Sequence, residues 1–247
     1  MRILLINPNT TAAMTMLLLE VLQPRLPCGV TLVPATGRFG AKYISSRSTH
    51  TIAAHAALDA YAEYGEDCDA VYLACFGDPG LLALKELAHV PVIGMAEASC
   101  IRAAAMAKRF SIVTGGERWG PILREFVTSI GLGAQLAAVE TVVPTGGDIA
   151  RDPDGAIAVL AEACQRTVLR DQAGAVILGG AGLAGLAARV QPYLQVPVVC
   201  SVEAGLEAVL AAVSTPAPKP QSGDISPPAP IASLGLSAWL ATLLAKP

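Results

Sequence analysis

The sequence predicts an α/β fold of two pseudo-symmetric lobes, each with a short parallel sheet flanked by helices, with an active-site cleft between them. Short apolar runs alternate along the chain with longer stretches of helical pattern, which is typical of successive βαβ units. Apolar residues make up 53% of the chain and charged residues 15%, so sheets can be buried on both faces. Matching segments in the two halves predict that the lobes share one topology.

Three segments of the first half recur in the second half in the same order and at nearly the same spacing. A single match carries little weight, because apolar strands resemble one another. Three ordered matches, with Glu97 and Glu203 in the same register, indicate an internal repeat. The matched pairs are 69–77 with 174–182, 90–98 with 196–204, and 4–7 with 111–114.

Turn and cap residues predict the element boundaries. Asn9 or Thr10 is placed to cap a helix that stops before Pro24, and glycine or proline turns follow most of the apolar runs. The polar connection 35–47 has a length that often carries function. The expected strands are 2–6, 29–34, 71–74, 90–94, 110–114, 136–143, 175–178 and 196–200, and the expected helices are 10–22, 49–64, 81–87, 96–108, 121–130, 154–171, a helix from about 186, and 203–213.

The repeat divides the chain into an N-terminal α/β lobe over 1–108 and a C-terminal α/β lobe over 109–215. A third segment covers 216–247. Its first part, 216–230, contains six prolines, which predicts a linker without regular structure. A helix over 234–245 then closes the chain, and we expect it to dock on the body.

Composition excludes several classes of partner. The net charge is −3 and aromatic residues are 4% of the chain, so nucleic acid is not an expected partner. The six cysteines are scattered, without a zinc-site spacing, which indicates reduced thiols in a cytoplasmic protein. We expect no membrane span, no metal and no cofactor, and a homo-oligomer that acts on a small molecule.

Cys75 is the candidate catalytic residue. It follows the buried strand 71–74 and precedes a turn and a helix from Leu81, at the strand end where open α/β sheets bind ligands. Amides at the helix start favour an anion and a thiolate, so we expect Cys75 to be the most readily alkylated cysteine. A lone cysteine is more often a small buried apolar residue, but the repeat favours the active-site interpretation.

The repeat also predicts which residues meet Cys75 across the cleft. Asn7 and Thr114 end matching strands, and Gly180 stands where Cys75 stands in the other lobe. Tyr43 lies in the polar connection and is placed to close over a substrate. The expected substrate-binding residues are Asn7, Tyr43, Phe76, Gly77, Thr114, Gly180, Ala181 and Gly182.

Four motifs resemble the aspartate/glutamate racemase superfamily, and in particular its hydantoin and allantoin racemase branch. They are residues 6–10, 75–80, 91–98 and 178–182, and the resemblance covers about residues 1–213. It implies two thiols on opposite faces of the substrate's stereocentre, one removing and one returning the α-proton. The first thiol maps onto Cys75. The second maps onto Gly180, where this sequence departs from the family pattern.

The resemblance therefore implies a cofactor-independent racemase of an amino acid or a derivative such as a hydantoin. Cys75 is the expected thiol base, and backbone amides of the two glycine turns are expected to stabilise the enolate. A second proton would come from Cys200, Tyr43 or water. Two alternatives stay open: a single-thiol enolate chemistry of the arylmalonate decarboxylase kind, and a catalytically silent binder of small carboxylates or ureides.

Overall fold

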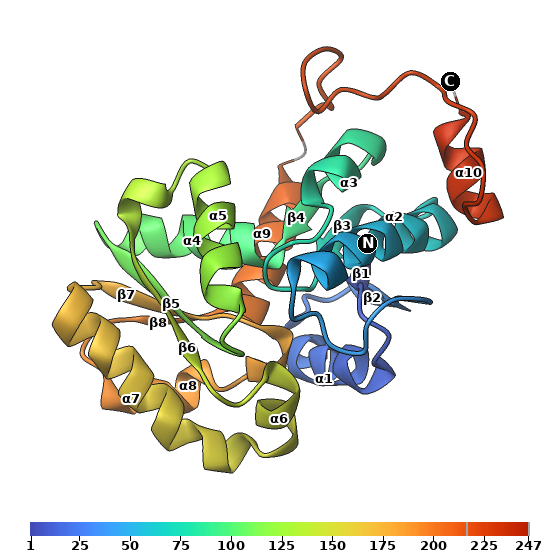
Figure 1. The fold of residues 1–247 in the computed structure, drawn as a ribbon. Coiled ribbons are helices and arrows are strands. Elements are labelled where there is room, and N and C mark those ends of the chain that lie inside the picture. Colours follow the sequence, from blue (N-terminus) through green and yellow to red (C-terminus); the bar gives the residue numbers. More distant parts are fainter. Residues whose placement is uncertain (216, 247) are drawn as a thin grey trace.

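The computed structural model describes residues 1–215 and 217–246 and contains two parallel four-stranded sheets (Figure 1). The first sheet has the order β2-β1-β3-β4 and the second has the order β6-β5-β7-β8, so the two lobes share one topology, as the repeat predicts. The strands are β1 (Arg2–Asn7), β2 (Thr31–Thr36), β3 (Ala70–Leu73), β4 (Val92–Gly94), β5 (Phe110–Gly115), β6 (Leu136–Val142), β7 (Ala175–Leu178) and β8 (Val198–Cys200).

Helices cover both sheets, and several begin at side-chain caps. The Ser46 side chain accepts from the Thr49 amide at the start of α2, and Thr145 and Asp148 cap each other at the start of α6. The helices are α1 (Ala12–Leu22), α2 (Arg47–Tyr64), α3 (Leu81–Leu87), α4 (Met95–Met106), α5 (Trp119–Ser129), α6 (Gly146–Arg151), α7 (Pro153–Asp171), α8 (Ala187–Val190), α9 (Ser201–Ser214) and α10 (Ala238–Leu244).

The helix expected from about residue 186 is present as the single turn α8, and because Pro192 lacks an amide donor the chain continues as a short 3₁₀ turn over Gln191–Tyr193. The connection after β6 contains α6, which the sequence analysis did not predict although Thr145 and Asp148 form a capping box there.

The central strands β1, β3, β5 and β7 are buried almost throughout, and one apolar core runs through both lobes. The last helix of each lobe joins the two. Helix α4 packs against β7, and α9 packs against β3, so each helix contacts the sheet of the opposite lobe. The Tyr72 hydroxyl of β3 donates a hydrogen bond to the Val202 carbonyl of α9 at 3.0 Å. A side chain at Gly205 would overlap the Tyr72 ring, so only glycine permits this approach.

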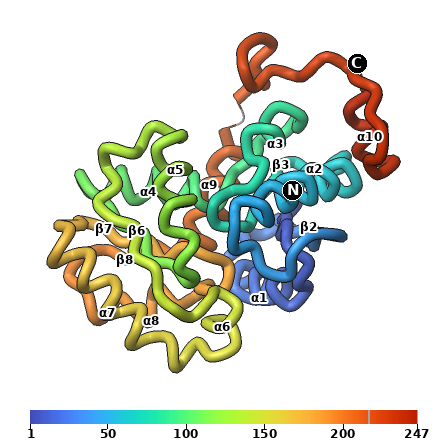
Figure 2. The backbone as a smooth tube through the Cα atoms, in the orientation of Figure 1, coloured from blue at the N-terminus to red at the C-terminus, as the bar shows by residue number. Residues whose placement is uncertain are grey.

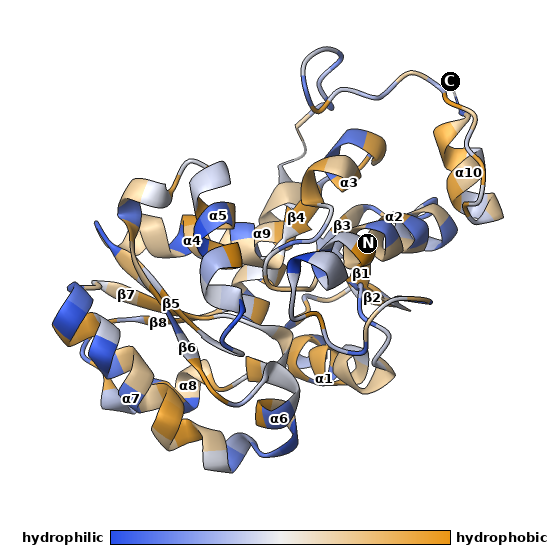
Figure 3. Cartoon of the chain, viewed as in Figure 1, coloured by the Kyte–Doolittle hydropathy of each residue, from blue (hydrophilic) through white to orange (hydrophobic). Residues whose placement is uncertain are grey.

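The C-terminal segment crosses the outside of the N-terminal lobe. The predicted segment 216–230 begins at residue 216, which together with residue 247 lies outside the described residues. Residues 217–237 contain no helix or strand and lead to α10, which packs on α2 (Figures 1 and 2). Helix α10 is largely apolar (Figure 3) and buries Leu240. No helix in residues 1–215 and 217–246 has the length and apolarity to cross a membrane.

Gly205→Ala should destabilise the protein by about 1–3 kcal/mol, because the added methyl would lie 2.2 Å from the Tyr72 hydroxyl oxygen. Chemical denaturation measures this change. Gly120→Ala in α5 is the matched control, since its new methyl would meet Thr141 at an ordinary 3.9 Å. Equal stability of the two variants would contradict the close contact between the lobes.

Candidate active site

The candidate site is a small cavity of about 50 Å³ where the carboxyl ends of β3, β5 and β7 approach one another. Residues from both lobes form its wall, although they are far apart in the sequence. The lining residues are Asn9, Met14, Tyr43, Ile44, Ala74, Cys75, Phe76, Thr114, Trp119, Gly146, Gly180, Ala181, Gly182 and Leu183.

Cys75 lies two residues beyond the end of β3 and is only 8% exposed. Burial raises the pKa of its thiol well above the ordinary value, and the nearby Asp78 carboxylate raises this pKa further. The expectation of a low thiol pKa was therefore wrong, because desolvation outweighs the helix start. Of the six cysteines, Cys28 is exposed and the other five are buried, so Cys28 is the accessible target for alkylation.

Gly180 faces the cavity from the C-terminal lobe. Its φ of 136° and ψ of 144° belong to a region that is almost restricted to glycine. A methyl group there would meet Leu183 at 3.4 Å and the Thr114 hydroxyl oxygen at 3.8 Å, which are ordinary contacts. Gly180 also donates its amide to the Ser201 hydroxyl at 3.1 Å. Space for a side chain therefore exists, and backbone conformation is the obstacle to one.

Thr114 is the penultimate residue of β5 and is buried beside Gly180. Its hydroxyl donates a hydrogen bond to the Gly179 carbonyl at 2.7 Å. This bond ties β5 to β7 at the cavity and fixes the hydroxyl oxygen with its acceptor lone pairs free for a ligand.

Tyr43 is carried into the cavity by residues 37–46, which we call the strap. The strap leaves the N-terminal lobe, yet the Tyr43 hydroxyl donates to the Gly115 carbonyl and accepts from the Gly146 amide, each at 3.2 Å. Burial raises the pKa of the Tyr43 phenol, while the bond from Gly146 lowers it. Tyr43 thus connects the two lobes over the cavity as a neutral hydroxyl.

Asn7 and Gly77 do not line this cavity, contrary to expectation. Asn7 is 1% exposed and uses its amide to bond Asn9 and Thr15, at 3.1 and 3.0 Å, inside the loop after β1. It therefore holds the loop that brings Asn9 to the cavity. Gly77 is buried beside Trp119, and its carbonyl lies 2.9 Å from Nε2 of His50.

Several lining residues were missed by sequence reasoning. Asn9 lies in a motif that was recognised, and Gly146 lies in a glycine turn after β6, so local signals were present for both. Trp119 follows the turn after β5 in a similar way. No local pattern distinguishes Met14, Ile44, Ala74 or Leu183 from ordinary core residues, since apolar side chains on buried elements all look alike in sequence.

The cavity wall carries no Asp, Glu, Lys, Arg or His in the described part of the chain. Its polar groups are hydroxyls, one side-chain amide, the thiol, the indole N–H of Trp119 and the backbone. The amides of Phe76, Ala181 and Gly182 donate no hydrogen bond to a protein acceptor within residues 1–215 and 217–246. Those residues also contain no group of three or more His, Cys, Asp or Glu placed to hold a metal ion.

Asp78 supports the turn that carries Cys75. It is 3% exposed, and its two carboxylate oxygens accept from the amides of Ala96 and Glu97 at 2.9 and 2.7 Å. Its own amide donates to the Cys75 carbonyl at 3.0 Å. Burial raises the pKa of Asp78 to about 8, against the opposing effect of the two amides. The carboxyl thus joins the Cys75 turn to the start of α4.

These features define a class of protein: a duplicated α/β fold with a buried thiol in a cavity between equivalent strand ends. The sequence model described as Asp/Glu/hydantoin racemase matches residues 3–209. The chain therefore belongs to the Asp/Glu/hydantoin racemase family.

Individual relatives agree with this assignment. The chain is 34% identical over 208 residues to a hydantoin racemase from Pseudomonas sp. (strain NS671), covering 84% of each chain. Allantoin racemase from Pseudomonas fluorescens superposes with a TM-score of 0.91 at 28% identity, covering 95% of this chain and 100% of that one. Allantoin racemase from Klebsiella pneumoniae gives 0.88 at 34% identity, covering 98% of both chains.

Asp78→Asn should change how stability depends on pH. Because the folded pKa of about 8 exceeds the ordinary 3.8, the folded wild type holds an extra proton between those values, and its stability falls as pH rises through this window. The stability advantage of wild type over Asp78→Asn should therefore shrink from pH 4 to pH 8, by at most about 1.4 kcal/mol per unit.

Denaturant titrations at several pH values measure this dependence. The control is Asp224→Asn, which removes an exposed carboxyl far from the turn. An advantage of wild type over Asp78→Asn that stays constant or grows with pH would show that the carboxyl of Asp78 is not held protonated by burial.

Proposed function

We propose that this chain is a cofactor-independent racemase of small, uncharged amino-acid derivatives of the hydantoin type. The family and the hydantoin and allantoin racemases among the relatives support an isomerase. The observation that carries the substrate class is the cavity wall, which has no charged side chain among the described residues.

The lack of charge separates two substrate classes. A free amino acid brings a carboxylate and an ammonium group, and burying unpaired charges costs several kcal/mol. A cyclic ureide carries the same stereocentre without either charge, and its N–H and C=O groups match hydroxyls and backbone amides. The cavity of about 50 Å³ further favours a small ring with a short substituent.

Cys75 is the group proposed to move the proton. The thiol first releases its proton to water, the resulting thiolate takes the proton from the ring carbon beside the carbonyl, and the electron pair of that C–H bond moves onto the carbonyl oxygen to form an enolate. The free amides of Phe76, Ala181 and Gly182 are the proposed donors to the developing charge, and one such donor is worth about 3 kcal/mol. The raised thiol pKa makes Cys75 a strong base once ionised and a proton donor at rest.

Inversion also needs a proton source on the second face, where Gly180 offers no side chain. Cys200 is buried and does not line the cavity, and the Tyr43 hydroxyl is held by two backbone partners. Gly180 therefore favours a second candidate: enolate chemistry on one face only, in which the Cys75 thiol protonates an enolate left by loss of another group. A silent binder is the third outcome that experiment must separate.

The wild-type protein in deuterated water should exchange the ring α-proton of a small 5-alkyl hydantoin. Cys75→Ala should lower the exchange rate by about 10²-fold or more, since it removes the acid–base group. Cys200→Ala is the matched control, a buried strand-end thiol outside the cavity. NMR follows exchange, and chiral chromatography follows inversion.

The outcomes separate the candidates. Exchange with inversion supports a racemase, and exchange with retention supports one-face chemistry by Cys75. Binding of the hydantoin without any exchange identifies a binder, and exchange that survives Cys75→Ala removes Cys75 from the mechanism.

Gly180→Cys should raise racemisation by about 10- to 100-fold, because it places a thiol opposite Cys75. The strained backbone at φ 136° should cost about 1–3 kcal/mol of stability. Gly180→Ala carries the same strain without the thiol and is the control. A folded Gly180→Cys variant no faster than Gly180→Ala would count against a two-face reaction geometry.

A further inference from the structure

The strap that carries Tyr43 and Ile44 over the cavity is fastened at its other end by Arg38. The Arg38 guanidinium donates twice to Oδ2 of Asp59 on α2, at 2.9 and 2.6 Å. It also lies 3.4 Å from Oε2 of Glu63. Asp59 is 2% exposed, and a buried carboxylate needs such a partner, so Arg38 is held firmly to α2.

The C-terminal helix contacts this ion-pair cluster through Trp239. Trp239 of α10 places its ring 4.8 Å from the Arg38 guanidinium carbon. This distance lies within the range of a cation–π contact, which is stronger where solvent is displaced. The neighbouring Leu240 is 2% exposed, so α10 is anchored by its own apolar face while Trp239, itself partly exposed, contacts Arg38.

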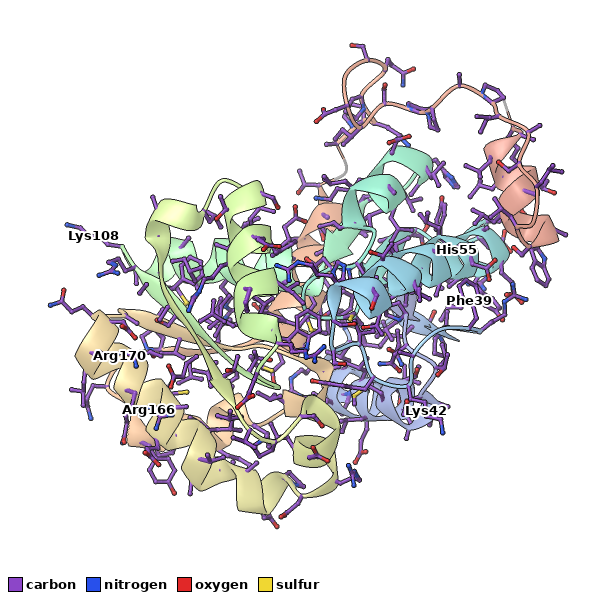
Figure 4. All side chains as sticks on the ribbon, viewed as in Figure 1. Phe39, Lys42, His55, Lys108, Arg166 and Arg170 are labelled. Carbon is purple, nitrogen blue, oxygen red and sulfur yellow. The ribbon has the colours of Figure 1, made fainter. Side chains whose placement is uncertain are left out.

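The strap transmits this attachment to the cavity through further contacts. Phe39 packs edge-on against His55 of α2 with ring centroids 4.8 Å apart (Figure 4). The carbonyl of Ala41 accepts from the Thr10 amide at 3.1 Å, next to the loop that presents Asn9. Directly after these contacts, Tyr43 and Ile44 enter the cavity wall. The path from α10 to the cavity is therefore short and continuous.

We propose that Trp239 and Arg38 form a clamp by which the C-terminal helix holds the strap closed over the cavity. Both are positioning residues, since neither lines the cavity. Weakening the clamp loosens the strap. The free-energy cost of ordering the strap around a bound molecule then rises. The effect on catalysis rests on the proposed function, whereas the effect on the strap itself does not.

Limited trypsin digestion of the full-length protein measures how readily the strap opens, through the rate of cleavage within it. Lys42 is exposed in the strap and provides the cleavage site, and Arg151 is exposed in the other lobe and provides an internal reference. Trp239→Ala should speed cleavage after Lys42 by about two- to five-fold, as loss of an exposed cation–π contact predicts, and leave cleavage after Arg151 unchanged. Trp239→Phe keeps an aromatic face and should restore the wild-type rate.

Leu234→Ala is the matched control, because Leu234 is 99% exposed in the same segment. An unchanged rate after Lys42 in Trp239→Ala overturns the clamp. Equal acceleration after Lys42 and Arg151 also overturns it, since that pattern means general loosening. Restoration by Trp239→Phe supports it.

Kinetics with the hydantoin of the exchange experiment give a second readout. Trp239→Ala should raise KM by about two- to five-fold with kcat nearly unchanged, because closure and not chemistry is affected. A loss in kcat alone contradicts the clamp. If the protein turns over no hydantoin, the proposed function fails while the digestion result still decides the clamp.

Discussion

The structure depends on the exchange of helices between its two lobes. Neither four-stranded sheet is covered by its own half of the chain alone, because α4 and α9 each pack against the sheet of the opposite lobe. The Tyr72 hydroxyl and the absence of a side chain at Gly205 allow α9 to lie directly on β3. This shared core fixes the carboxyl ends of the strands opposite each other, and the cavity lies where they meet. The site therefore depends on the contacts of α4 and α9 with the opposite lobe.

The same burial determines the chemistry available to Cys75. A buried thiol is expensive to ionise, so its resting form is neutral and its anion is strongly basic. Asp78, buried three residues later, adds a second group whose charge state responds to the same environment. Opposite them stands Gly180, whose backbone conformation excludes most side chains. The two faces of the cavity are thus chemically unequal, although the lobes that supply them are equivalent in topology.

An uncharged wall and a strap across the cavity work together. Hydroxyls and backbone amides recognise a neutral polar ring only when water is kept out, because water competes for the same hydrogen bonds. Tyr43 closes the wall by bonding the backbone of the opposite lobe. Arg38 connects the strap to α2, and Trp239 connects it to the last helix of the chain. Helix α10, which follows both sheets in the sequence, therefore contacts the strap that lies over the cavity.

The sequence was sufficient for the strands, for most helices, for the repeat and for the position of Cys75. Apolar runs that end in glycine turns specify buried parallel strands, and a repeated pattern specifies two equivalent lobes, because both signals are carried by the order of residue types along the chain. Tertiary structure alone decided that Asn9 and not Asn7 lines the cavity. It also decided that α4 and α9 pack on the sheet of the opposite lobe. It also decided that the pKa of Cys75 rises, because desolvation depends on atoms packed around the sulfur from distant segments, which no local pattern encodes.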